Sequence, residues 1–459
     1  MTLIRSKYGY FLNLFVLFSF ILFFLLTHAV SALDSLRLSV SLAIDLLTGS
    51  LIWIFASKKK HFHIFELFGI GIVIGSTLST IAQLLTRNTF IQPFVNLPLC
   101  LLVVVLALKR LVLALKRLRS TEAQIEIQTP VLSTNLGILA SALLLISGDR
   151  YYLWTATLLL FAAFIFATKF DNENIDTWRS RIFSAALVAG YAAVTLGAAS
   201  VVETLIFGRR TTISYVSGWD GVIFEASSKA LIRYGPFDHI FLSNIKYAYY
   251  WFHDAWAGAF TQRAGVADWI VTTQFGTVVV AISSITLLYV IVERRVSNPK
   301  FRIFVLAIVA SPSLIGAPSA LLSLASFSQM LALLWIITLA FLIDEFFSQA
   351  NRWVAIFIVF FSCILVMTKL TIAVPVIAGN IAAWFALTAL KSTNKGLKLF
   401  AVSGGLTILA SGILYVIFIR PEPDLAQTYF TFEIGFTEKM FGIVTGQLIL
   451  DIVIFFIVK

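Results

Sequence analysis

Charged residues are scarce in this sequence. Only 12% of its 459 residues are charged, whereas 59% are hydrophobic, and the mean hydropathy is +0.94. The apolar residues come in runs of about 20, the length that a helix needs to cross a bilayer core, where no water is present to pair with backbone groups. The composition therefore excludes a soluble globular domain. It predicts an all-α fold, a polytopic transmembrane helical bundle of about 13–14 spans.

Cysteine and acidic residues are scarce as well. The two cysteines, Cys100 and Cys363, both fall inside expected spans, which argues against a disulfide framework and against a thiolate metal site. There are 34 lysines and arginines against 23 acidic residues, for a net charge of +11. The basic residues stand at the ends of spans on alternate sides, so the charge reflects membrane topology and not a nucleic-acid surface.

The distribution of basic residues predicts the orientation. Most of the 34 fall on the side of the N-terminus, so the positive-inside rule puts that end in the cytoplasm of a multi-pass protein of the plasma (inner) membrane. Residues 1–181 form an N-terminal module of about six spans. Residues 182–419 carry seven more spans and the longest non-spanning segment, 207–268, which is then extracytoplasmic. Residues 420–459 add an outer loop and a last span.

The long outer loop is patterned as two helices. The first carries apolar residues on one helical face, with Glu225, Lys229 and Arg233 four residues apart on another, and Gly235-Pro236 ends it. The second, about 238–263, is rich in tyrosine and tryptophan, which prefer the level of the lipid headgroups. We therefore expect two juxtamembrane amphipathic helices lying along the outer membrane surface.

The loop also carries a loose motif. Asp220 stands just before the first helix, Gly235 follows it, and residues 249–256 read YYWFHDAW. This arrangement resembles the GT-C superfamily of polytopic membrane glycosyltransferases, whose shared core has seven helices with the long loop between the first and the second. Residues 182–419 would form that core. Six spans precede it here, and the loop acids Asp220 and Glu225 are not adjacent, which departs from the family pattern.

The resemblance implies an inverting glycosyltransferase (EC 2.4 class). It would move a sugar from a polyprenyl-phosphate-linked donor to a glycan, lipid or protein acceptor on the outer side. Asp220 would accept the proton of the acceptor hydroxyl, or would hold a divalent cation, Mg²⁺ or Mn²⁺, together with Glu225. Lys369, at the outer end of a span, would stabilise the phosphate leaving group. Substrate contacts are expected from three further residues, Arg233, His253 and Asp254.

Each of these residues also has a purely structural interpretation. Asp220 is suited to cap the following helix, and Glu225 and Arg233 to a solvated, salt-bridged face. A histidine in an aromatic interfacial helix is commonly a belt residue, as we expect for His253. Lys369 has a stem long enough to reach the headgroups.

Two other functions stay open on the sequence. Asp45, Glu203 and Asp451 are acids inside expected spans, which is typical of a transporter or flippase of a lipid-linked or polar substrate. The loop arginines fit an O-antigen polymerase or ligase, which would transfer a preassembled glycan; these are Arg209, Arg210, Arg233 and Arg263. His61 and His63, by contrast, are expected in a charged cytoplasmic loop that offers too few ligands for a metal.

Overall fold

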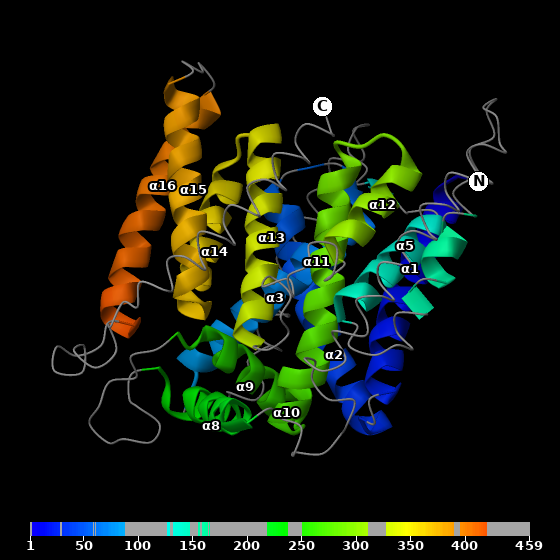
Figure 1. Ribbon diagram of the computed structural model, residues 1–459, viewed down its shortest axis with the longest axis horizontal. Coiled ribbons are helices and arrows are strands. Elements are labelled where there is room, and N and C mark those ends of the chain that lie inside the picture. The colour runs from blue at the N-terminus through cyan, green and yellow to red at the C-terminus, as the bar shows by residue number, and fades with distance from the viewer. Residues whose placement is uncertain are drawn as a thin grey trace, which may run out of the picture.

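The computed structural model is an all-helical bundle with one very small sheet (Figure 1). The residues that the structure describes are 2–27, 30–57, 59, 61–87, 126–128, 132–146, 155–156, 158–163, 165, 218–236, 250–310, 327–389 and 395–419. Five helical segments are long and apolar enough to cross a membrane: 32–57, 64–85, 268–293, 330–348 and 399–418. This agrees with a membrane protein. Residues 182–206, expected to begin the seven-span core, and residues 420–459 lie outside the described part.

The elements follow in this order in the first half of the chain: α1 (Thr2–Thr27), α2 (Ala32–Ser57), β1 (His61–His63), α3 (Ile64–Leu85), β2 (Glu126–Gln128), α5 (Leu132–Ile146) and α8 (Gly218–Tyr234). The second half contains α9 (Phe252–Ala264), α10 (Asp268–Ile270), the π-helix η3 (Val271–Phe275), α11 (Gly276–Glu293), α12 (Pro299–Ala310), α13 (Phe327–Ser348), α14 (Arg352–Thr368), α15 (Leu370–Ala389), α16 (Lys395–Leu414) and the π-helix η4 (Tyr415–Ile419). The apolar runs that fall within the described residues are thus helices close to where hydropathy puts them.

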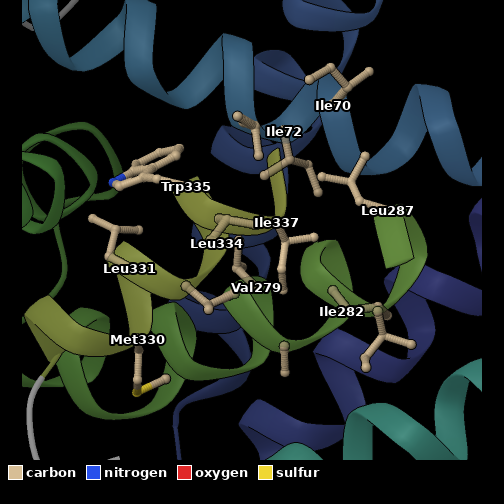
Figure 2. Packing of buried hydrophobic residues seen from close by; sticks show 14 of the residues in the cluster. Ile70, Ile72, Val279, Ile282, Leu287, Met330, Leu331, Leu334, Trp335 and Ile337 are labelled. Carbon is tan, nitrogen blue, oxygen red and sulfur yellow. The ribbon is translucent and has the colours of Figure 1, made fainter. Parts of the chain in front are cut away.

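The core lies where α3, α11 and α13 meet. Figure 2 shows Ile70 and Ile72 of α3 facing side chains of α11 and α13, among them Val279, Leu334 and Trp335. All of these side chains are buried. Such continuous apolar packing fixes the bundle but carries no polar chemistry, so functional groups must be sought at its ends.

The helices α2 and α3 pack closely as a hairpin through glycine. A Cβ atom added at Gly49 would lie 1.9 Å from the carbonyl oxygen of Gly71, and one added at Gly75 would lie 1.8 Å from that of Asp45. Small residues at such positions let helix backbones approach, which is how helices associate in a membrane. The close approach also brings Asp45 against α3.

Replacing Gly75 with alanine should therefore destabilise the protein. The added methyl group has to displace backbone, and overpacking of this kind costs about 1–3 kcal/mol. The matched control is Gly404→Ala in α16, where nothing lies within 4 Å of an added Cβ; we expect it to be neutral or to stabilise by up to about 1 kcal/mol. Thermal unfolding in detergent, followed by circular dichroism, compares the two. Equal Tm values would contradict the close approach.

The two ends of the bundle differ in character. At one end, Lys59, Arg294 and Asn351 follow or precede spans, and Asn351 Nδ2 donates to the carbonyl oxygen of Ala56 at 2.8 Å. We call this the charged end. At the opposite end α8, α9 and α10 lie together across the ends of the long helices, drawn at the bottom of Figure 1. We call this the α9 end. Which side of a membrane each end faces stays a prediction.

Two expectations for the connecting segments were wrong. His61–His63, expected as loop, forms β1, which pairs in parallel with β2, with His61 opposite Glu126. The second loop helix, expected over about 238–263, is interrupted at Tyr250 and Trp251, which are not helical, so α9 begins at Phe252; residues 237–249 lie outside the described part, and the expectation stays a prediction there. Short strands of three residues leave no hydropathy period to detect, and tertiary packing decides where α9 starts.

Candidate functional site

Lys369 lies at the α9 end, at the break between α14 and α15. Its backbone is extended (φ −161°, ψ 95°), so the residue stands between two helices. The Nζ atom donates a hydrogen bond of 2.7 Å to Tyr250 Oη, and it lies 4.4 Å from the centroid of the Tyr250 ring. Lys369 is thus held by the residue that precedes α9 by two positions and does not simply extend toward the headgroups.

The base of this arrangement is rigid. Trp335 Nε1 in α13 donates to Thr368 Oγ1 at 3.0 Å, directly beside Lys369 in sequence. The Trp335 ring packs edge-on against Phe252 of α9, with 6.2 Å between centroids. Three helices, α9, α13 and α14, therefore fix the place of one ammonium group.

His253 is buried near Lys369, with its ring 5.7 Å from that of Tyr250, and Asp254 is buried beside His253. Their side chains are each 1% exposed, and His253 Nε2 lies 3.2 Å from Asp254 Oδ1. Burial, with the positive charge of Lys369 as a smaller cause, lowers the pKa of His253 to about 3. Burial, with the negative charge of Asp268 as a smaller cause, raises the pKa of Asp254 well above its usual value. At neutral pH the imidazole is neutral, and the pair favours keeping its proton on the carboxyl group.

This pair gives a pH dependence with a definite sign. The folded pKa of His253 lies below its unfolded value of 6.5, so its stabilising effect is present above pH 6.5 and is lost as the pH falls from 6.5 toward 3. Relative to His253→Gln, the wild type should lose about 2 kcal/mol between pH 7 and pH 5, since each pKa unit is worth about 1.4 kcal/mol. Tm values of both proteins over this pH range measure the loss. A Tm difference between the two proteins that does not change with pH would contradict the lowered pKa of His253.

Helix α9 is buried on every side, contrary to the expected amphipathic surface helix. All residues from Phe252 to Phe260 are buried. Trp256 packs against Phe260 at 4.5 Å and against Phe327 of α13 at 5.6 Å between centroids. His253 is accordingly no belt residue at a lipid boundary. The aromatic composition indicated a membrane interface, but the same residues serve here as core packing.

The structure brings some of the predicted site residues together and leaves others apart. His253, Asp254 and Lys369 meet at the α9 end. Arg233 does not join them: it is exposed and lies over the ring of Tyr234, with 5.4 Å from its guanidinium carbon to the centroid. Lys229 is exposed on the same helix, as a solvated face requires.

The two loop acids, Asp220 and Glu225, both lie on α8. Asp220 falls in the first turn of α8, two residues after its start at Gly218, and not at the N-cap. A carboxylate in a first turn is favourable for the helix dipole. Glu225 lies about one and a half turns further along the helix; the side chains of both acids are outside the described part. Among the side chains that are described, no three of His, Cys, Asp or Glu are close enough to hold a metal ion.

The features behind the two other functions are in part accounted for. Asp45 forms an ion pair with Arg263, with 2.8 Å between Oδ1 and Nη1. Asp45 is therefore not an isolated intramembrane acid, and Arg263 is not an exposed loop arginine. Glu203, Asp451 and the two arginines at positions 209 and 210 lie outside the described residues.

Sequence reasoning missed an ionic network at the charged end. Lys59 bridges Glu66 of α3 (Nζ to Oε1, 2.9 Å) and Glu345 of α13, and Arg294 reaches Glu345 and Asp344, each at 2.7 Å. Glu66 and Glu345 are buried. Acids near the ends of several spans were the signal available, but which ones pair depends on helix packing.

The sequence matches no family model, and neither a curated protein nor a solved structure matches it significantly.

Proposed function

We propose that this chain is a membrane glycosyltransferase of the GT-C type that transfers a sugar from a polyprenyl-phosphate-linked donor to an acceptor on the extracytoplasmic face, with inversion. The observation that carries the proposal is the contact of Lys369 with Tyr250 near His253, which in turn contacts Asp254, at the start of α9. A cation held in place beside buried polar groups is suited to an anionic leaving group.

The orientation in this proposal follows from charge. Lys59, Arg294 and Arg295 lie at the charged end, and Lys58 and Lys60 flank Lys59 in sequence. The positive-inside rule assigns this end to the cytoplasm of the inner membrane. The α9 end then faces outward, where a lipid-linked donor would present its phosphate at headgroup depth.

The chemistry divides among three groups. The Lys369 ammonium would neutralise the phosphate oxygen that gains charge as the glycosidic bond to the polyprenyl phosphate breaks. Asp220, on the helix that packs against α9, would accept the proton of the attacking hydroxyl. His253, neutral at neutral pH, and Asp254, whose pKa is raised by burial, would orient hydroxyl groups.

The test is sugar transfer in membranes that contain the protein. With labelled polyprenyl-phosphate sugars as donors, Asp220→Asn should lower transfer by about 10²-fold or more, since an amide accepts no proton. Asp34→Asn is the matched control, because Asp34 is an outlying carboxylate near the start of α2 whose partner is the half-exposed Arg37. Transfer that is unchanged in Asp220→Asn, at a normal amount of protein, would reject the proposal.

A further inference from the structure

Arg263, near the end of α9, is bound by polar side chains of α2 and α3. Its Nη1 and Nη2 atoms donate to the two carboxylate oxygens of Asp45 at 2.8 and 3.0 Å. The side chains of Arg263 and Asp45 are 4% and 0% exposed. Such a bidentate pair fixes direction as well as distance, because both planar groups must align.

Neighbouring residues of α3 complete this arrangement. Ser79 Oγ donates to Asp45 Oδ1 at 2.6 Å. Gln83, with its amide oxygen turned toward Arg263, accepts from Nε at 3.2 Å and donates to the carbonyl oxygen of Ala259 at 3.2 Å. On the other side the guanidinium lies over the Phe260 ring, 4.3 Å from its centroid. We call Asp45, Ser79 and Gln83 the Arg263 receptor.

A buried ion pair is weak support for stability as such, because apolar residues of similar volume often serve as well. Instead, the ion pair restricts α9 to one position on the bundle, because its two planar groups must align. Helix α9 has only 13 residues and no side-chain hydrogen bond at its N-cap, and from Phe252 to Phe260 its buried residues are mostly apolar. Thr261 adds a hydrogen bond to Asp268 of α10 at 2.9 Å, but α10 is itself a short neighbouring segment and not part of the α2–α3 hairpin. Apolar contacts alone tolerate rotation and sliding of a short helix.

We propose that Arg263 is a positioning residue: its docking in the Arg263 receptor sets the rotation and register of α9, and thereby places His253 and Asp254 beside Lys369. Ten residues separate His253 from Arg263, about 15 Å along the helix at 1.5 Å per residue. The helix is thus held at both ends, by Arg263 on α2–α3 and by Tyr250 on Lys369. The link to catalysis rests on the proposed function; the link to the position of α9 does not.

The test measures how well α9 is seated, without any need for activity. Cys100 and Cys363 are replaced by Ser and Ala, and a single cysteine is introduced at Ala255, which is fully buried in α9. The pair is then converted to apolar residues of similar size, Asp45→Leu with Arg263→Met, so that no unpaired charge remains. A second probe, Thr338→Cys, reports on the buried middle of α13.

Maleimide labelling in membranes gives the result. In the double variant the cysteine at position 255 should react at least about tenfold faster than in the native pair, whereas the probe at 338 should not change, as expected for local opening of one unit. Equal labelling rates at position 255 in the native pair and the double variant would overturn the proposal, because apolar packing alone would then hold α9 in place.

A third variant is used if the double variant loosens the whole fold and not α9 alone. Should both probes react faster in the double variant, Asp45→Glu, which keeps the charge and moves it by one methylene, is compared instead. Faster labelling at 255 alone supports positioning, and unchanged labelling overturns it. If labelling behaves as proposed while no membrane preparation transfers sugar, positioning stands and the glycosyltransferase proposal fails.

Discussion

Lys369→Met should lower sugar transfer by about 10²–10³-fold, the loss that follows removal of one fixed group that stabilises developing negative charge. Methionine keeps the apolar stem and the packing against Tyr250 but removes the ammonium. Lys369→Arg keeps the charge and should retain part of the activity, although its planar fork does not reproduce the 2.7 Å hydrogen bond to Tyr250 Oη.

The same variant has a consequence that does not involve activity. The positive charge of Lys369 is one of the two causes that lower the pKa of His253. Without it the pKa of His253 should rise, although burial still holds it below 6.5. Histidine NMR over a pH series measures this, and the sequence holds only five histidines. An unchanged pKa would show that the ammonium is not near His253.

The matched control for Lys369 is Lys229→Met. Lys229 is an exposed lysine of α8, so its loss removes the same charge from the same end of the bundle. We expect its transfer activity to stay within about threefold of the wild type, the scale of exposed charge effects. Equal losses in the two variants would mean that overall charge, and not the fixed site, controls the reaction.

Asp45→Asn should destabilise the protein by about 3–5 kcal/mol, because it leaves the buried Arg263 guanidinium without its counter-charge. The unpaired charge would persist, because Arg263 cannot lose its proton. Water cannot readily reach it either, since only 4% of its side chain is exposed. The measurement is thermal or denaturant unfolding in detergent micelles, together with the amount of folded protein in membranes.

The control for Asp45 is Ser79→Ala. It removes only the hydroxyl that donates to Asp45 Oδ1 and leaves the ion pair intact, so we expect a cost of about 1 kcal/mol. A cost for Asp45→Asn as small as that for Ser79→Ala would indicate that the ion pair is solvated in the membrane-bound protein.

Several helices could be predicted closely from hydropathy. The apolar runs of the sequence at 64–85, 353–367 and 370–390 form α3, α14 and α15, with no end differing by more than one residue. Prediction from hydropathy succeeds here because a long enough apolar segment is stable in a bilayer as a helix, whichever helices become its neighbours. Lys369 could be singled out for the same reason, as a lysine at the end of a span.

The site could be predicted only in part. His253 and Asp254 were identified by residue type, but their burial reverses the expected belt position, and Tyr250 and Thr368 gave no signal of their own. The pairing of Asp45 with Arg263 joins residues 218 apart in sequence. No periodicity or spacing carries such information, because it depends on which helices become neighbours.

The sequence by itself determined that this is an apolar helical protein, and where most of its described spans begin and end. Those properties depend on how each segment partitions between lipid and water. Only the tertiary structure decided that α9 is enclosed by the bundle, that Lys369 is held by Tyr250, and which buried charges pair. These depend on distances between separate helices, where burial and partner charges set the protonation and orientation of each group.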